Sequence, residues 1–225
     1  NVEVFSGNSL QHLIRWSLEN ELPGLQWFAG IPGSVGGGVV YNIHGGTKLF
    51  SDYIKEIIVL DQDGKVKKID VSDERKKQKA GFAYDKSFFQ KEKLVILKVV
   101  FNLSRGDILR ARHVYQEWWQ RKLKVQPQAN CAGSVFRNFS AAAAKKAGAP
   151  TPSAGWFVDQ AGFKGKILGG VQVFPRHANF IVNLGDGKTG DVKKLLKIIK
   201  KSVKKKFKLS LKEEILFLPP GKRIF

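Results

Sequence analysis

A glycine-dense segment at 29–38, AGIPGSVGGG, carries five glycines and one hydroxyl, Ser34. Glycines allow positive φ and let backbone N–H groups approach a ligand, which is how a backbone concavity binds phosphate. The segment is not a Walker loop, because no Gly-Lys-Ser/Thr triplet follows it. The pattern therefore indicates either a phosphate-binding loop or a tight turn.

A second segment, CAGSVFRN at 131–138, places Ser134 directly after a glycine and Asn138 four residues later. The order predicts a serine hydroxyl on a rigid turn, with an amide and the Arg137 guanidinium beside it. A capped loop that precedes a helix explains the same residues. A nucleophile elbow does not, since the pattern Gly-x-Ser-x-Gly is absent.

A third segment holds two carboxylates, Glu213 and Glu214, in the apolar stretch LKEEILFL. Alternation predicts a final strand over 213–218, in which one carboxylate shares a face with Leu216 and Leu218. A carboxylate on a half-buried face tends toward a raised pKa and suits a proton relay. The other interpretation is an edge-strand charge that discourages aggregation.

The elements that must position these segments are mixed helices and strands. Apolar spacing predicts helices over 9–22, 104–124 and 191–207. Asp63-Gly64 predicts a β-hairpin turn. Strands and helices do not alternate strictly, so we expect an α+β fold. The composition changes after residue 104, which predicts two domains, 1–104 and 105–225.

The charge balance is strongly basic: 39 Lys+Arg against 19 Asp+Glu give a net charge of +20. This favours an anionic partner, namely nucleic acid, a membrane surface or a phosphate-bearing small molecule. Nucleic acid rests on charge alone, so we expect none. The lysines of KKLLKIIKKSVKKKFK are most simply a solvated helix face.

Other features narrow the class of protein. No apolar run is long enough to cross a bilayer, so we expect a soluble protein without a membrane span. One cysteine and four histidines without ligand spacing predict no metal site. The absence of methionine and the strand-like opening NVEVF predict that the chain lacks its natural beginning.

Taken in order, the strings GLQWFAGIPGSVGG, VLDQDG, CAGSVFRN, PSAGWFVDQAGFKG, GGVQV and HANFIVN resemble the UDP-N-acetylenolpyruvoylglucosamine reductase (MurB) family. The resemblance implies a cytoplasmic, monomeric flavoprotein of peptidoglycan precursor synthesis. It would use FAD and NADPH to reduce UDP-N-acetylglucosamine enolpyruvate. The fold implied is the second part of a two-subdomain FAD-binding fold (PCMH/VAO-type), followed by a C-terminal α+β substrate-binding domain. The first flavin subdomain would be missing.

The same resemblance implies roles for particular residues. Ser134 would be the proton donor, and Glu214 would orient the enolpyruvyl group. The flavin pyrophosphate would be contacted by Pro32, Gly33, Ser34, Gly36 and Gly37. The substrate would be contacted by Asn138, His177 and Lys122, with Lys124 as a rival for Lys122.

Two motifs depart from the family pattern. FAYDKS at 82–87 has Asp85 where the family has an arginine that stabilises the developing anion, with Lys86 next to it. NIHGGT at 42–47 lacks the family tyrosine. These departures suggest an alternative: a catalytically impaired paralogue that binds flavin or nucleotide-sugar without turnover.

Overall fold

The computed structural model describes residues 1–218 and divides the chain into two compact units, Asn1–Lys122 and Leu123–Phe225. The division falls inside helix α4 (Ile108–Val125), rather than before it, where the sequence placed the boundary. The reason is packing: Ala111 is buried in the core of the first unit, and Tyr115 packs against that core. Most of α4 therefore belongs with the first unit.

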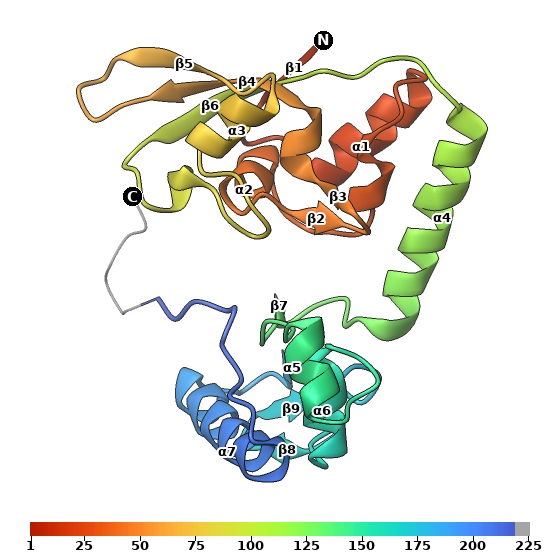
Figure 1. The fold of residues 1–225 in the computed structure, drawn as a ribbon, viewed down its shortest axis with the longest axis vertical. Coiled ribbons are helices and arrows are strands. Elements are labelled where there is room, and N and C mark those ends of the chain that lie inside the picture. The colour runs from red at the N-terminus through yellow and green to blue at the C-terminus, as the bar shows by residue number, and fades with distance from the viewer. Residues whose placement is uncertain (219–225) are drawn as a thin grey trace. The chain divides into compact units, whose positions relative to one another are not determined.

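The first unit is built on a four-stranded antiparallel sheet in the order β1-β6-β4-β5 (Figure 1). Its strands are β1 (Val2–Phe5), β4 (Ile54–Leu60), β5 (Val66–Asp70) and β6 (Val95–Phe101). A small ladder joins β2 (His44–Gly45) to β3 (Lys48–Leu49). The helices are α1 (Leu10–Glu19), α2 (Val35–Val40) and α3 (Glu74–Lys79), with short 3₁₀ turns at Leu25–Phe28, Phe50–Tyr53 and Phe88–Gln90.

Local chemistry accounts for the element ends. The Ser9 hydroxyl accepts a hydrogen bond from His12 N at 3.4 Å and so caps α1. The predicted hairpin at Asp63-Gly64 is confirmed between β4 and β5. Gly64 has φ +76°, and the Asp61 carboxylate accepts from the Asp63 and Lys65 amides. This conformation favours glycine because it carries no Cβ penalty.

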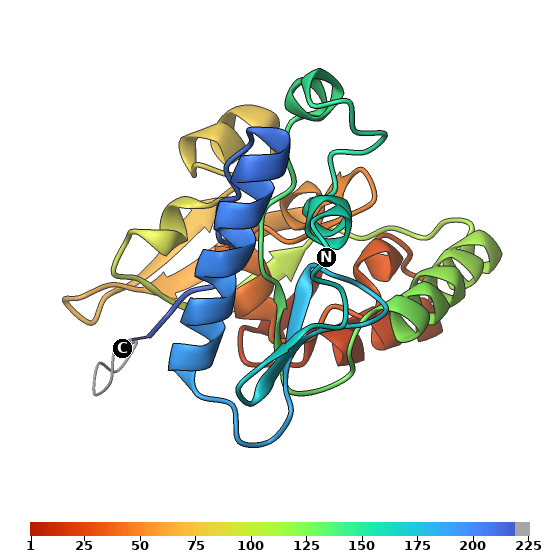
Figure 2. The same cartoon turned by 90° about the horizontal axis from the view of Figure 1, so that it is seen from below.

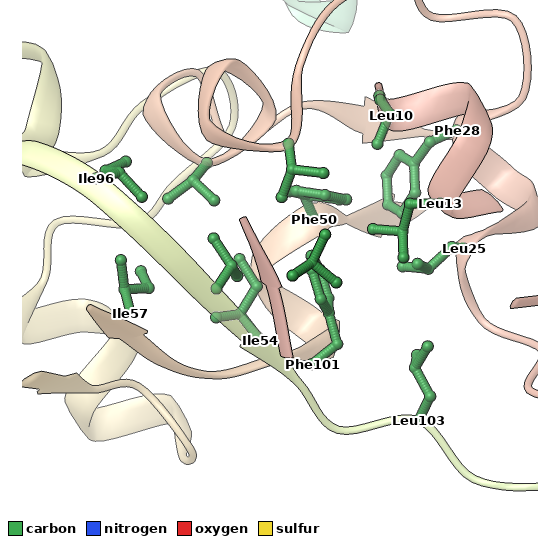
Figure 3. Packing of buried hydrophobic residues seen from close by; sticks show 14 of the residues in the cluster. Leu10, Leu13, Leu25, Phe28, Phe50, Ile54, Ile57, Ile96, Phe101 and Leu103 are labelled. Carbon is green, nitrogen blue, oxygen red and sulfur yellow. The ribbon is translucent and has the colours of Figure 1, made fainter. Parts of the chain in front are cut away.

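Aromatic rings tie the first core together (Figure 3). Phe28 meets Phe50 edge to face at 5.2 Å between centroids, and Phe50 meets Phe101 at 5.3 Å. Leu10 and Ile14 of α1 are almost fully buried against them. Burial of each such side chain stabilises the fold by about 1.5–3 kcal/mol, so this core holds the loops of the first unit in place.

The second unit has a four-stranded antiparallel sheet in the order β7-β10-β9-β8. Its strands are β7 (Cys131–Ser134), β8 (Ile167–Leu168), β9 (Val171–Val173) and β10 (Phe180–Asn183). Its helices are α5 (Ala141–Lys146), α6 (Ala154–Gln160) and α7 (Thr189–Phe207). Phe136, Phe157, Val173, Leu196 and Val203 form the centre of a separate apolar core.

Three expected elements differ in the structure. The final strand predicted over 213–218 is wrong: up to residue 218 there is one isolated bridge, Phe136 to Glu213. Pairing stops because Ile215 and Phe217 pack against the core of the second unit instead of extending a ladder. The glycine segment at 29–38 is not all loop, because helix α2 begins within it at Val35. The segment at 131–138, expected as a loop or turn, begins with strand β7. Among residues 1–218, no helix is both long and apolar enough for a membrane span.

Candidate functional site

The loop that follows Ser134 is held in place by one buried amide, Asn179. The Asn179 side chain accepts a hydrogen bond from Phe136 N at 3.0 Å and donates one to Phe136 O at 2.8 Å. Its backbone carbonyl accepts from Val135 N at 2.8 Å. Three hydrogen bonds from one residue therefore fix the backbone immediately after the Ser134 hydroxyl.

Asn138 and His177 both lie against the first turn of α6. The Asn138 side-chain oxygen accepts from Ala154 N at 3.0 Å, which satisfies one of the free amides at the helix start. The His177 ring packs closely against Gly155 of α6: a Cβ added at Gly155 would lie 3.0 Å from the ring. Burial lowers the pKa of His177, which favours the neutral imidazole over the charged one.

Glu214 is brought next to Ser134 through the backbone. The Glu214 amide donates to Val135 O at 2.8 Å, one residue after Ser134. The neighbouring carboxylate, Glu213, forms an ion pair with Lys200 of α7 at 2.9 Å.

A cavity of about 590 Å³ opens beside this region in the second unit. Val135 and Ile215 line it, together with Cys131, Val171 and Asn183 among others. Ser134 and Glu214 are not among its lining residues and border it only through their chain neighbours.

In the first unit, the glycine loop uses several of its own amides internally. Gly36 N donates to Ser6 O at 2.8 Å, and Gly37 N donates to the Ser34 hydroxyl at 3.2 Å. A Cβ at Gly36 would lie 2.9 Å from Ser6 Cβ, so close packing alone requires glycine there. Gly33, with φ +125°, has open space where a Cβ would stand.

Lys122 contacts this loop. Its ammonium donates to Ala29 O at 2.6 Å, and it lies 6.0 Å from the centroid of the Trp118 ring. Its side chain also covers Gly30, where a Cβ would be 2.8 Å from Lys122 Cδ. Burial lowers the pKa of Lys122 to about 8.

The two departures from the family motifs contact each other. His44 Nδ1 lies 3.0 Å from the Asp85 carboxylate, and the Tyr84 hydroxyl lies 2.7 Å from His44 Nε2. The rings of His44 and Tyr84 are 4.1 Å apart between centroids. Asp85 has φ +55°, and its carbonyl accepts from Gln90 Nε2. The Asp85 carboxylate, the His44 imidazole and the Tyr84 phenol thus form one hydrogen-bonded chain.

The buried side chain of Asn42 connects the two loops, 42–47 and 82–87, that contain these three residues. It donates to Ala83 O at 2.9 Å and accepts from Ser51 N at 2.9 Å. The Asp85 charge is therefore engaged by His44, whereas Lys86 is exposed. Within residues 1–218, no group of three or more His, Cys, Asp or Glu side chains is placed to hold a metal ion.

Sequence reasoning missed Asn179, His44 and Tyr84. Asn179 stands inside the string HANFIVN, but nothing in the string indicates that its amide reaches Phe136, 43 residues away. The His44–Asp85 contact spans 41 residues and joins two motifs that were read separately.

Comparison with known proteins assigns this fold to a class. Residues 126–218, which lie within the second unit, match the family model "UDP-N-acetylenolpyruvoylglucosamine reductase, C-terminal domain". The chain also resembles the crystal structure of UDP-N-acetylenolpyruvylglucosamine reductase from Thermus caldophilus. The TM-score is 0.79 at 27% identity, over 97% of this chain and 73% of that one. The class is that of mixed α+β proteins with this reductase C-terminal domain.

Curated relatives define the family. The chain is 33% identical to UDP-N-acetylenolpyruvoylglucosamine reductase of Prochlorococcus marinus, over 95% of this chain and 68% of the relative. It is 34% identical to the reductase of Acaryochloris marina, over 96% of this chain and 66% of the relative. The chain thus spans about two thirds of the length of these relatives. It belongs to the UDP-N-acetylenolpyruvoylglucosamine reductase family.

Proposed function

We propose that this protein carries out the family reaction, the FAD- and NADPH-dependent reduction of UDP-N-acetylglucosamine enolpyruvate to UDP-N-acetylmuramate. One observation supports the proposal: Glu214 N donates to Val135 O, so the backbones of the predicted carboxylate residue and of the residue after the predicted proton donor, Ser134, are hydrogen-bonded. In this proposal, the first unit is the remainder of a PCMH/VAO-type FAD-binding domain, and the second unit binds the UDP-sugar. The reaction belongs to peptidoglycan precursor synthesis in the cytoplasm.

The glycine loop offers two free donors for the flavin pyrophosphate. In the described chain, the amides of Gly33 and Ser34 make no hydrogen bond, and Gly33 is exposed with no atom in the way. Such amides suit a phosphate oxygen. Gly36 and Gly37 hold the loop in shape instead, since their amides are bonded within the first unit. Pro32 precedes the two free donors and presents no N–H of its own.

When bound, FAD supplies the hydride chemistry, with NADPH as its source of electrons. The chain's own residues supply position and a proton. The Ser134 hydroxyl gives its proton to the carbon that gains negative charge, and Glu214 orients the enolpyruvyl group. Asn138 and His177, together at the start of α6, contact the substrate. The neutral state of His177 makes it a hydrogen-bonding group there.

Lys122 contacts the substrate in this proposal, as the resemblance implied, and it also supports the glycine loop. Its ammonium is bonded to Ala29 O and lies in the same unit as the glycine loop, so it supports that loop.

The alternative is a catalytically impaired paralogue that binds flavin or nucleotide-sugar without turnover. The observation that favours it is the pairing of Asp85 with His44, because this position supplies no guanidinium to a developing anion. The two proposals agree on binding and differ on turnover.

The purified chain tests both. Absorbance near about 450 nm reports oxidised flavin, and NADPH oxidation that requires the enolpyruvyl substrate reports turnover. We expect S134A to lower kcat by about 10²–10⁴-fold with little change in flavin content. The control is S210A, because Ser210 is an exposed residue of the same unit that forms no hydrogen bond with residues 1–218. Flavin binding without turnover in the unmodified chain would favour the paralogue, and full activity of S134A would remove Ser134 from the mechanism.

A further inference from the structure

One side of α7 is a continuous face of lysines. We name this the basic face; it consists of Lys193, Lys194, Lys197, Lys200, Lys201, Lys204, Lys205 and the C-cap Lys208. With 3.6 residues per turn, these positions fall within an arc of about 140°. The opposite side of the helix is apolar and buried in the core of the second unit, through Leu195, Leu196, Ile199 and Val203. The lysines therefore lie on the side of α7 opposite the buried one. Figure 2 shows α7 as the long blue helix.

Little of this charge is neutralised within the described chain. One ion pair reaches the basic face, from Lys200 to Glu213 at 2.9 Å. The acidic residue of α7 itself, Asp191, accepts from Lys188 N at the helix start. From Lys193 to Lys208 the face extends for about 22 Å, at 1.5 Å per residue. It is a positive strip in which Lys200 is paired with a carboxylate.

Exposed apolar side chains accompany the basic face. The segment 215–218 runs next to the start of α7, since Lys193 Nζ lies 5.1 Å from the centroid of the Phe217 ring. In that segment Leu216 is 71% exposed and Leu218 is 61% exposed. On α7 itself, Ile198 is 44% exposed at the border of the lysines. Large apolar groups beside a lysine strip are typical of proteins that adsorb to membranes.

We propose that the basic face, together with Leu216 and Leu218, binds the surface of an anionic lipid membrane. A juxtamembrane lysine contributes about 1 kcal/mol of attraction to an anionic leaflet, so several lysines on one face give measurable adsorption. The apolar side of α7 is committed to the core and cannot insert, so binding is peripheral. The exposed leucines reach into the headgroup region.

The same residues fit nucleic acid less well. Single-stranded nucleic acid is bound by positive grooves that also carry aromatic platforms for the bases. The aromatic residues of α7 and 215–218 are Phe207 and Phe217; both are partly buried, and lysine ammoniums lie over their rings. The basic face is the outer side of a single helix, which suits a planar partner.

Vesicle co-sedimentation of the full chain tests the proposal. We expect binding to vesicles with roughly 30% phosphatidylserine in phosphatidylcholine, weakened by salt, and none to pure phosphatidylcholine. The variant K197E/K201E/K204E should bind at least tenfold more weakly, and the L216S variant severalfold more weakly. Circular dichroism confirms that each variant folds.

A charge-matched control separates the basic face from overall charge. K65E/K91E/K93E changes three exposed lysines of the first unit that form no ion pair with any of residues 1–218. It lowers the net charge by the same amount and should bind within twofold of the unmodified chain. Equal loss in both variants, or equal binding to neutral vesicles, overturns the proposal. Absence of vesicle binding also overturns it, and tight binding of RNA through the same three α7 lysines would then assign the basic face to nucleic acid.

Discussion

Substitution of Asn179 by alanine should destabilise the second unit selectively. The side chain makes two hydrogen bonds to the buried Phe136 backbone, at 3.0 and 2.8 Å, and alanine leaves both backbone groups without a partner. Each unsatisfied buried group costs about 1–3 kcal/mol, so we expect a loss of about 2–6 kcal/mol in the free energy of unfolding. Because the total stability of a domain is about 5–15 kcal/mol, this is a large fraction of it.

Urea unfolding with hydrogen exchange by mass spectrometry measures this loss. Peptides that cover β7 and the following loop should lose protection, whereas those of the first-unit sheet should not. N138A is the matched control, because Asn138 accepts a single hydrogen bond, from Ala154 N. It should cost less than half as much.

Two results would refute the reasoning. If N179A and N138A were equally stable, the bidentate contact with Phe136 would contribute nothing. If both units lost protection together in N179A, the second unit would not be an independent structural unit.

Three further predictions concern residues of the first unit. Since burial lowers the pKa of Lys122 from 10.5 to about 8, the folded state loses this proton before the unfolded state. The free energy of unfolding should rise relative to that of K122M between pH 8 and 10.5, by at most about 3 kcal/mol, in paired urea titrations. Because His44 Nδ1 faces the Asp85 carboxylate, the ring should be the tautomer with its N–H at Nδ1, and ¹⁵N NMR should show that D85A loses this preference. G36A should destabilise by about 1–3 kcal/mol in urea, because its Cβ would lie 2.9 Å from the nearest atom; G190A, in open space on α7, should not.

The structure also changes how the two motif departures are understood. Taken singly, Asp85 introduces a negative charge where the family has a positive one, and His44 is one of four scattered histidines. In the structure they form one hydrogen-bonded pair that also engages Tyr84. A carboxylate that is mostly buried needs such a partner, which is a physical reason for the two residues to occur together in this chain.

Local pattern was enough for several elements. The apolar spacing over 9–22 predicted α1, and Asp63-Gly64 predicted the β4–β5 hairpin. The family was also recognisable from the order of short strings, and the comparisons confirm it. These features depend on residues close together in the chain, whose conformational preferences act whatever the remainder does.

The expected strand at the C-terminal end shows where pattern fails. The residues around Ile215 alternate as a strand would, yet only Glu213 forms a bridge. Ile215 packs against the second core and not into a ladder, because a strand exists only where a neighbouring edge offers partners. Alternation reports which side chains are apolar, not whether an edge is available.

By itself, the sequence determined the family, the α+β class, the basic charge and the residue types available for catalysis. Only the tertiary structure decided which of these residues meet: Asn179 with Phe136, His44 with Asp85, and Lys122 with the loop at Ala29. Each of these contacts joins residues more than forty positions apart. A hydrogen bond requires its two atoms within about 3 Å, and over such separations that distance is set by packing of the whole unit rather than by neighbours in the chain.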